Sequence, residues 1–205
     1  MKLNYSARKR LLDLSFAFLL LFFVFSWLFP LIAILIRLTS KGPVFFIQSR
    51  SGCNGQIINC YKFRTMVYTS QDVCDNGMYL QATPDDFRVT LFGKFLRKTS
   101  LDELPQIWNV LMGEMSLVGP RPHPLPLDKE CEDTIENYKL RYLVKPGITG
   151  WAQVNGARGG TQTIGAMQRR IDLDIWYIQH WSFKLDLKIV LLTFWKLIKG
   201  DQNAY

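Results

Sequence analysis

The longest apolar segment of the chain covers residues 11–36, where Asp13 is the only charged residue. As a straight α-helix, this run would be about 39 Å long, which exceeds the roughly 30 Å hydrocarbon core of a bilayer. The segment therefore predicts a helix in a membrane. The rest of the chain then forms a domain on one side of that membrane.

Two features favour a helix that enters the membrane and returns to the same face. Pro30 lies inside the run, where it removes a backbone hydrogen bond and bends the helix, and Ser26 one turn earlier could satisfy a freed carbonyl. Basic residues flank both ends of the run, whereas a crossing helix has only one cytoplasmic end for them. We expect a re-entrant helix broken at Pro30, and a crossing helix remains the alternative.

The next segments alternate between strand-forming and turn-forming residues. Residues 41–48 predict a turn and a short strand, residues 57–66 predict a second strand, and Gly and Asn residues lie between them. This order is typical of a β-hairpin. Lys62 and Arg64 would share one face of it, either as binding residues or as a solvated edge. Residues 67–86 are polar and predict a loop.

Later segments show the periodicity of helices. One short helix precedes a pair of adjacent acids, one charged helix lies on the surface, and two amphipathic helices follow. The last of them carries Trp and Lys residues that suit either the headgroup layer or packing on the domain. The four segments are residues 87–97, 128–142, 167–177 and 185–199. Together the patterns predict an α+β fold: a membrane anchor in residues 1–40 and a cytosolic catalytic domain with interfacial helices in residues 41–205.

Composition narrows the range of partners. The chain has 205 residues, a net charge of +8 and a sequence pI of about 9.4, which suits nucleic acid, anionic lipid or a phosphorylated substrate. The four cysteines have no metal-site spacing, and two histidines are too few to complete a zinc site. We therefore expect reduced thiols.

The adjacent acids Asp102 and Glu103 are the first candidates for chemistry. They follow Ser100, and the spacing Ser100-x-x-Glu103 is that of a capping box that only begins a helix. The alternative is a carboxylate nucleophile beside a metal-binding carboxylate, with Arg97 nearby to neutralise phosphate charge. The two acids alone leave both interpretations open.

Two further segments carry groups that could bind phosphate. Prolines on both sides of Arg121 stiffen its backbone, which suits a pre-ordered guanidinium. His123 could contact a phosphate or a sugar hydroxyl, although an ordinary surface histidine is the simpler expectation. Residues 145–160 are rich in glycine but lack the order of a P-loop. Within them, Trp151 or Arg158 could stack on a nucleobase, or the tryptophan could be buried.

In combination, these motifs resemble those of a known family. The chain resembles the bacterial sugar transferases of the monotopic phosphoglycosyl transferase family, the undecaprenyl-phosphate glucose and galactose phosphotransferases among them. The resemblance covers nearly the whole chain in order. It is carried by residues 42–46, 62–66, 100–106, 116–122 and 145–156.

The resemblance implies a two-step reaction with a covalent intermediate. Asp102 would attack the β-phosphate of a UDP-sugar, UDP-glucose or UDP-galactose, and release UMP. Undecaprenyl phosphate would then take the sugar phosphate from Asp102. Glu103 would bind Mg²⁺, and Pro30 would break the re-entrant helix. Basic side chains would bind substrate or phosphate: Lys62, Arg64, Arg97, Arg121, His123 and Arg158.

The resemblance also implies where the chain acts. It would lie in the bacterial inner membrane, with the catalytic domain on the cytoplasmic face, and catalyse the first membrane step of exopolysaccharide, capsule or O-antigen synthesis. Its partners would be the UDP-sugar, undecaprenyl phosphate and membrane lipid, without nucleic acid; a homo-oligomer stays open. Two alternatives remain: a UDP-sugar glycosyltransferase with Asp102 as base, and a non-enzymatic membrane adaptor.

Overall fold

The computed structural model describes residues 6–70, 73–74, 79–83, 85–161 and 163–199. The α-helices are α1 (Ala7–Leu20), α2 (Ser26–Thr39), α3 (Leu91–Thr99), α4 (Ile107–Met112), α5 (Leu125–Cys131), α6 (Trp151–Val154), α7 (Ile164–Gln179) and α8 (Phe183–Lys199). The strands are β1 (Phe45–Ser51), β2 (Ile57–Phe63), β3 (Ser116–Val118) and β4 (Gly147–Thr149). Between them lie a π-helical segment, η1 (Leu21–Phe25), and 3₁₀ segments η2 (Cys53–Gly55), η3 (Leu101–Gln106) and η4 (Tyr138–Leu143).

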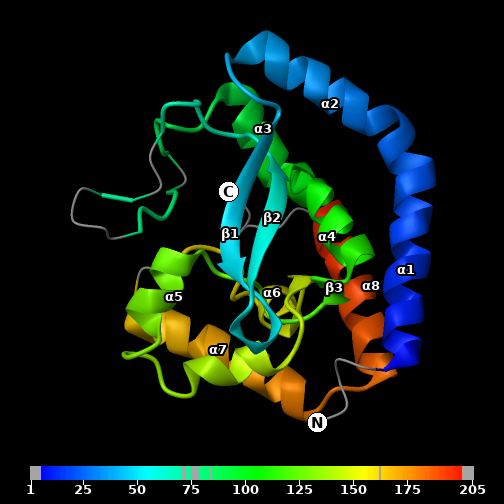
Figure 1. Cartoon of the computed structure of the whole chain (residues 1–205), viewed down its shortest axis with the longest axis vertical. Coiled ribbons are helices and arrows are strands. Elements are labelled where there is room, and N and C mark those ends of the chain that lie inside the picture. Colours follow the sequence, from blue (N-terminus) through cyan, green and yellow to red (C-terminus); the bar gives the residue numbers. More distant parts are fainter. Residues whose placement is uncertain (1–5, 71–72, 75–78, 84, 162, 200–205) are drawn as a thin grey trace.

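The N-terminal helix is continuous from Ala7 to Thr39 and bends where α1 meets α2 (Figure 1). Among the described residues it is the one helix long and apolar enough to cross a membrane, with a mean hydropathy of 2.8. The predicted break at Pro30 is not confirmed, because α2 continues through Pro30 and the irregular turn is η1, which ends five residues earlier. A proline ring crowds the turn before it, and the wider π turn accommodates that strain. Ser26 Oγ donates to Phe22 O at 2.9 Å, whereas the carbonyl that Pro30 frees is that of Ser26 itself, four residues before the proline.

The predicted β-hairpin is confirmed. Strands β1 and β2 are antiparallel and pair from Phe45–Phe63 to Ser51–Ile57. The connecting turn contains Asn54 and Gly55, both at positive φ, which explains the turn-forming residues at this place.

A second, parallel pair of strands was not predicted from the sequence. Strands β3 and β4 are three residues each, and Ser116 pairs with Gly147 while Val118 pairs with Thr149. The backbones approach so closely that a Cβ on Gly147 would lie 2.1 Å from Gly119 N. Only glycine fits at position 147, and the pairing fixes the chain on either side of Pro120 and Arg121.

The main core joins elements that are distant in the sequence. Ile107 and Val110 of α4, Val118 of β3, Ile178 of α7 and Ile189 of α8 are all buried in one cluster. The two amphipathic helices agree with the predicted periodicity: α8 and the C-terminal part of α7 pack in this core, while Met167 and Ile171 of α7 pack in a second cluster with α5 and η4. The core therefore holds η3 and β3, the two segments that carry the candidate site, against a rigid base.

One predicted element is wrong. Residues 128–142 were expected to form a single surface helix, but α5 ends at Cys131 and a separate 3₁₀ segment, η4, follows. Tyr138 and Arg141 in η4 are buried, with exposed fractions of 1% and 4%. Their charges and hydroxyls bind other polar groups beneath the site, so the polar pattern reflects a buried network and not a solvated face.

Both ends of the N-terminal helix are bound to the same domain. Near the start of α1, the Lys9 ammonium forms a buried ion pair with Asp186 of α8 at 2.7 Å and donates to Val118 O at 2.8 Å. After α2, the Arg64 guanidinium donates to the backbone carbonyls of residues 40, 41 and 43. The helix thus leaves the domain at α8 and β3 and rejoins it at the hairpin (Figure 1).

Candidate active site

Asp102 and Glu103 lie in η3, the 3₁₀ segment between α3 and α4. Helix α3 ends at Ser100, which adopts a left-handed conformation (φ 59°), and the chain re-enters a helical path with Pro105 inside the first turns. The capping box is not formed, because the Ser100 side chain makes no cap bond and the Glu103 carboxylate points to other partners. The acids therefore do not serve merely to begin a helix.

Two cations bind the Glu103 carboxylate. Lys62 Nζ on β2 lies 2.6 Å from one carboxylate oxygen, and Arg121 Nη1 lies 2.9 Å from the other. Arg121 Nη2 also donates to Glu103, so the guanidinium binds the carboxylate in the bidentate manner. Burial alone would raise the pKa of Glu103, but the charges and hydrogen bonds of Arg121 and Lys62 outweigh it and hold that pKa well below its usual value.

The Asp102 carboxylate differs sharply from its neighbour. It is 9% exposed and makes no hydrogen bond or ion pair with any residue that the structure describes. Burial and the negative charge of Glu103 raise the pKa of Asp102 to about 6. At neutral pH the group is therefore mainly an ionised carboxylate without a committed partner, which is the state a nucleophile or base requires.

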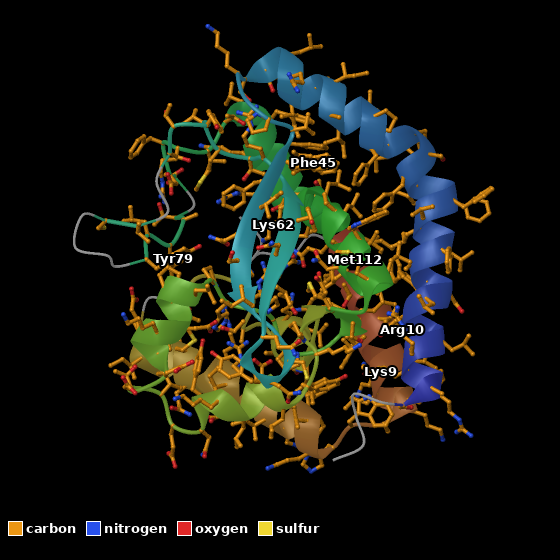
Figure 2. The ribbon with its side chains drawn as sticks, in the orientation of Figure 1. Lys9, Arg10, Phe45, Lys62, Tyr79 and Met112 are labelled. Carbon is orange, nitrogen blue, oxygen red and sulfur yellow. The ribbon has the colours of Figure 1, made fainter. Side chains whose placement is uncertain are left out.

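Asp102 and Glu103 line a cavity of about 620 Å³ between the hairpin and the loop that carries Tyr79. Figure 2 labels Lys62 on the hairpin and Tyr79 on that loop, and both residues line the cavity. Cationic side chains dominate its charged lining, which suits a polyphosphate ligand. These residues are Arg50, Lys62, Arg64, Arg97, Arg121, Arg158 and Arg170.

The predicted phosphate-binding arginines have different neighbours. Arg97 donates to Thr65 Oγ1 at 2.9 Å, and Arg158 donates to Ser100 Oγ, on the residue before η3, at 2.5 Å. Arg64 also lines the cavity, yet its guanidinium is bonded to the three backbone carbonyls after α2. Its observed bonds connect the end of the N-terminal helix to the site.

The expectation of a surface histidine at position 123 is wrong. His123 is 3% exposed, and its Nδ1 lies 2.6 Å from both Arg141 Nη1 and Tyr138 Oη. Burial and the charges of Arg141 and Arg170 lower the pKa of His123 well below its usual value, so the imidazole is neutral. It lines the cavity as part of a buried network behind Arg121.

Two buried arginines that were not assigned to the site from the sequence hold its loops in place. Arg170 of α7 donates to Ala157 O at 3.0 Å and also to Gly159 O, on both sides of Arg158. Arg141 donates to Arg121 O and to Asp174 at 3.2 Å. The periodicity of α7 could have identified Arg170 as a buried residue. Arg170 lies next to Ile171 and one turn after Met167, on the buried face of the helix.

The donor set at the site fits a magnesium ion shared with a substrate. Among the described residues, no cluster of three or more His, Cys, Asp or Glu side chains could form a closed metal cage. Mg²⁺ does not need one, since it is commonly held by one or two carboxylates together with water and substrate phosphates. Lys62 and Arg121 occupy three of the roughly four lone-pair positions of the Glu103 carboxylate, which leaves one on Oε2, and Asp102 is adjacent.

Comparisons with known proteins give the family of the chain. A family model described as bacterial sugar transferase matches residues 4–200. The chain is 50% identical over 188 residues to the UDP-glucose:undecaprenyl-phosphate glucose-1-phosphate transferase of Klebsiella pneumoniae, covering 92% of this chain and 39% of that relative. The protein of the same name from Caulobacter vibrioides is 48% identical over 198 residues, which cover 97% of this chain and 72% of the relative.

A relative with a different sugar in its name is also similar. The UDP-N-acetylgalactosamine-undecaprenyl-phosphate N-acetylgalactosaminephosphotransferase of Aeromonas hydrophila is 40% identical over 177 residues, covering 86% of this chain and 40% of the relative. The chain spans about two fifths of the length of this relative and of the Klebsiella protein. Since the family model covers nearly every residue, the chain belongs to the bacterial sugar transferase family.

Proposed function

We propose that the chain transfers a sugar-1-phosphate from a UDP-sugar to undecaprenyl phosphate and releases UMP. The observation that carries this proposal is the contrast between two adjacent acids: Glu103 is held by two cations, whereas Asp102 is unpaired in a cavity lined by cations. The names of the relatives, most of which combine a UDP-sugar with undecaprenyl phosphate, support the same reaction.

In the first step, an Asp102 carboxylate oxygen attacks the β-phosphorus of the UDP-sugar. A bond forms between that oxygen and phosphorus, the bond from phosphorus to the bridging oxygen breaks, and UMP leaves with the electron pair. In the second step, a phosphate oxygen of the acceptor attacks the same phosphorus and restores the Asp102 carboxylate. Lys62, Arg97, Arg121 and Arg158 neutralise charge on the phosphate oxygens, as phosphoryl transfer requires.

Glu103 has two roles in this proposal. It orients Lys62 and Arg121 through the hydrogen bonds described above. Glu103 would also hold Mg²⁺, which would supply positive charge to offset the negative charge on the phosphate during transfer. The Glu103 charge raises the pKa of Asp102, which keeps the nucleophile basic.

We further propose that the N-terminal helix is re-entrant and that the domain lies on the cytoplasmic face of the inner membrane. Lys9 and Arg64 bind the two ends of the helix to one domain, so both ends lie on the same side. The helix has large apolar residues exposed at its bend, among them Phe22 at 77% and Phe23 at 68%, which suits burial in lipid.

The topology can be tested with single cysteines in an otherwise cysteine-free chain. Cysteines at Arg8 and Lys41, which are exposed at the two ends of the helix, should both resist a membrane-impermeant reagent in intact cells and react after lysis. Labelling of either position in intact cells would support a crossing helix instead.

For the donor, we propose UDP-glucose, and for the pathway, the first membrane step in the synthesis of a surface polysaccharide. The Klebsiella and Caulobacter names support glucose, while the Aeromonas name indicates that related chains use another sugar.

Purified protein in detergent, mixed with UDP-glucose and undecaprenyl phosphate, should release UMP. Release of UDP would instead indicate a glycosyltransferase, and no nucleotide release with a panel of UDP-sugars would leave a non-enzymatic role.

A further inference from the structure

A second, smaller cavity of about 190 Å³ lies behind η3, between α1 and α8. Most of its wall is apolar, with Phe16 and Leu20 from α1 and Val190 and Phe194 from α8. Glu103 and Arg158 line this cavity and also the cation-lined cavity of the active site. Two cavities of opposite character therefore meet at the same pair of charged residues.

We propose that this second cavity receives the isoprenoid chain of the acceptor next to its phosphate. The inference rests on the proposed function and adds a separate route for the tail: the acceptor phosphate takes the position that UMP leaves, opposite Asp102, because in-line attack on the same phosphorus requires it. A polyprenyl phosphate has a charged head and an apolar tail, so its site must change from cationic to apolar over a short distance. The boundary at Arg158 provides that change, because cationic side chains gather on its active-site side and the wall of the second cavity is mostly apolar.

The helices that form the cavity also face lipid. Phe18 of α1 is 59% exposed, and Ile198 of α8 is 82% exposed, so the outer surfaces of both helices are strongly apolar. Inside, the rings of Phe16 and Phe194 are 5.8 Å apart and bridge the two helices along the cavity wall. A lipid chain entering between α1 and α8 would leave bilayer for protein without crossing water.

One buried polar atom is evidence for a phosphate at the inner end of this cavity. The Gln153 side chain is 6% exposed, and its Oε1 has no hydrogen-bond partner among the described residues, while its Nε2 donates to Ile148 O. A buried acceptor without a donor is uncommon in a folded protein. The P–OH of a singly protonated phosphate monoester could supply the missing donor.

Another apolar cavity, of about 620 Å³, lies under the bend of the N-terminal helix, but it suits the acceptor less well. It is lined by residues such as Phe25, Phe29 and Trp108. None of the described residues that line it is charged, so nothing there would hold the phosphate. The continuity with Glu103 and Arg158 favours the cavity between α1 and α8.

The test fills the cavity and separates the two half-reactions. Val190→Phe adds bulk on the α8 wall and Leu20→Phe adds it on the α1 wall, while Leu191→Phe is the matched control because Leu191 is 69% exposed and does not line the cavity. UMP release is measured first with UDP-glucose alone, as a single-turnover burst. The KM for undecaprenyl phosphate is then measured in steady state in detergent micelles.

We expect both filling variants to keep the UMP burst and to raise the KM for undecaprenyl phosphate about tenfold or more, with no change in Leu191→Phe. A burst also verifies that each variant is folded. An unchanged acceptor KM in both filling variants would overturn the inference, and so would loss of the burst in both, because the cavity would then serve the donor. Absence of a burst in the unmodified protein would refute the proposed function itself.

Discussion

Lys62 on β2 and Glu103 on η3 are 41 positions apart in the sequence and form a buried ion pair of 2.6 Å. This pair joins the hairpin to the segment that carries the adjacent acids. Because Arg121 binds the same carboxylate, three separate segments of the chain meet at one group. The neighbouring Asp102 has no such partner among the residues that the structure describes, and the proposed chemistry depends on that difference.

Removal of the lysine should therefore impair catalysis more than folding. We expect Lys62→Met to lower kcat/KM for the UDP-sugar about a hundredfold, which is typical for the loss of one positioned cation or donor. Arg121 still pairs with Glu103 in this variant, so the protein should remain folded. Lys98→Met, at an exposed lysine of α3, is the control and should have nearly normal kinetics. Equal effects in the two variants would show that only the overall charge matters.

The raised pKa of Asp102 also predicts how stability depends on pH. Its native pKa is about 6 against an ordinary value of 3.8, so the folded state binds this proton more tightly than the unfolded state. The contribution of the group to stability is present below pH 4 and is lost as the pH rises through 6. Asp102→Asn should thus raise the free energy of unfolding at pH 8 by on the order of 2 kcal/mol.

That gain should disappear near pH 4, and the variant should be inactive at every pH. Chemical denaturation in detergent at the two pH values provides the measurement. Asp133→Asn, at an exposed acid, should change the unfolding free energy little at either pH. A loss of stability in Asp102→Asn at pH 8 would mean that the ionised carboxylate has a favourable partner.

Arg170 is expected to act through Arg158, since it binds the backbone carbonyls of residues 157 and 159. Lysine keeps the charge but lacks the forked donors needed for two carbonyls. Arg170→Lys should lower kcat/KM by about 10- to 100-fold through misplacement of the loop. Arg169→Lys, at the exposed neighbour, should be close to normal.

A double-mutant cycle distinguishes this role from a general loss of stability. Once Arg158→Met has removed the guanidinium, a further Arg170→Lys change should cost much less than it does alone. If the two effects simply multiply, Arg170 does not act through Arg158.

The buried pair Lys9–Asp186 should be essential for attachment of the N-terminal helix. Lys9→Met leaves the Asp186 charge buried without its cation, which typically costs about 3 kcal/mol or more. Addition of Asp186→Asn should recover much of that loss because the uncompensated charge is gone. Thermal unfolding in micelles measures both effects, with the exposed Arg8→Met as control. Failure of the second substitution to restore stability would show that the charge is not the cause.

The sequence predicted the structural elements that depend on the pattern of neighbouring residues. The apolar run, the hairpin with its Asn-Gly turn and the amphipathic helices α7 and α8 could all be inferred. The absence of a capping box at Ser100 could not, since Lys62 and Arg121 compete for Glu103 from distant segments. Long-range pairing also explains the unpredicted strands β3 and β4.

The burial of His123 could not be predicted for a related reason. Its neighbours Tyr138 and Arg141 lie in a segment whose charged residues suggested a surface helix. Buried polar groups satisfied by one another give no apolar signal in the sequence, so pattern alone assigns them to the surface.

The most direct test of the covalent mechanism is the mass of the intact chain after reaction with UDP-glucose in the absence of acceptor. The mechanism predicts an added hexose phosphate on Asp102, which disappears when undecaprenyl phosphate is supplied and never forms in Asp102→Asn. If product accumulates with acceptor present while no such adduct is ever detected after rapid quenching, Asp102 does not act as the nucleophile.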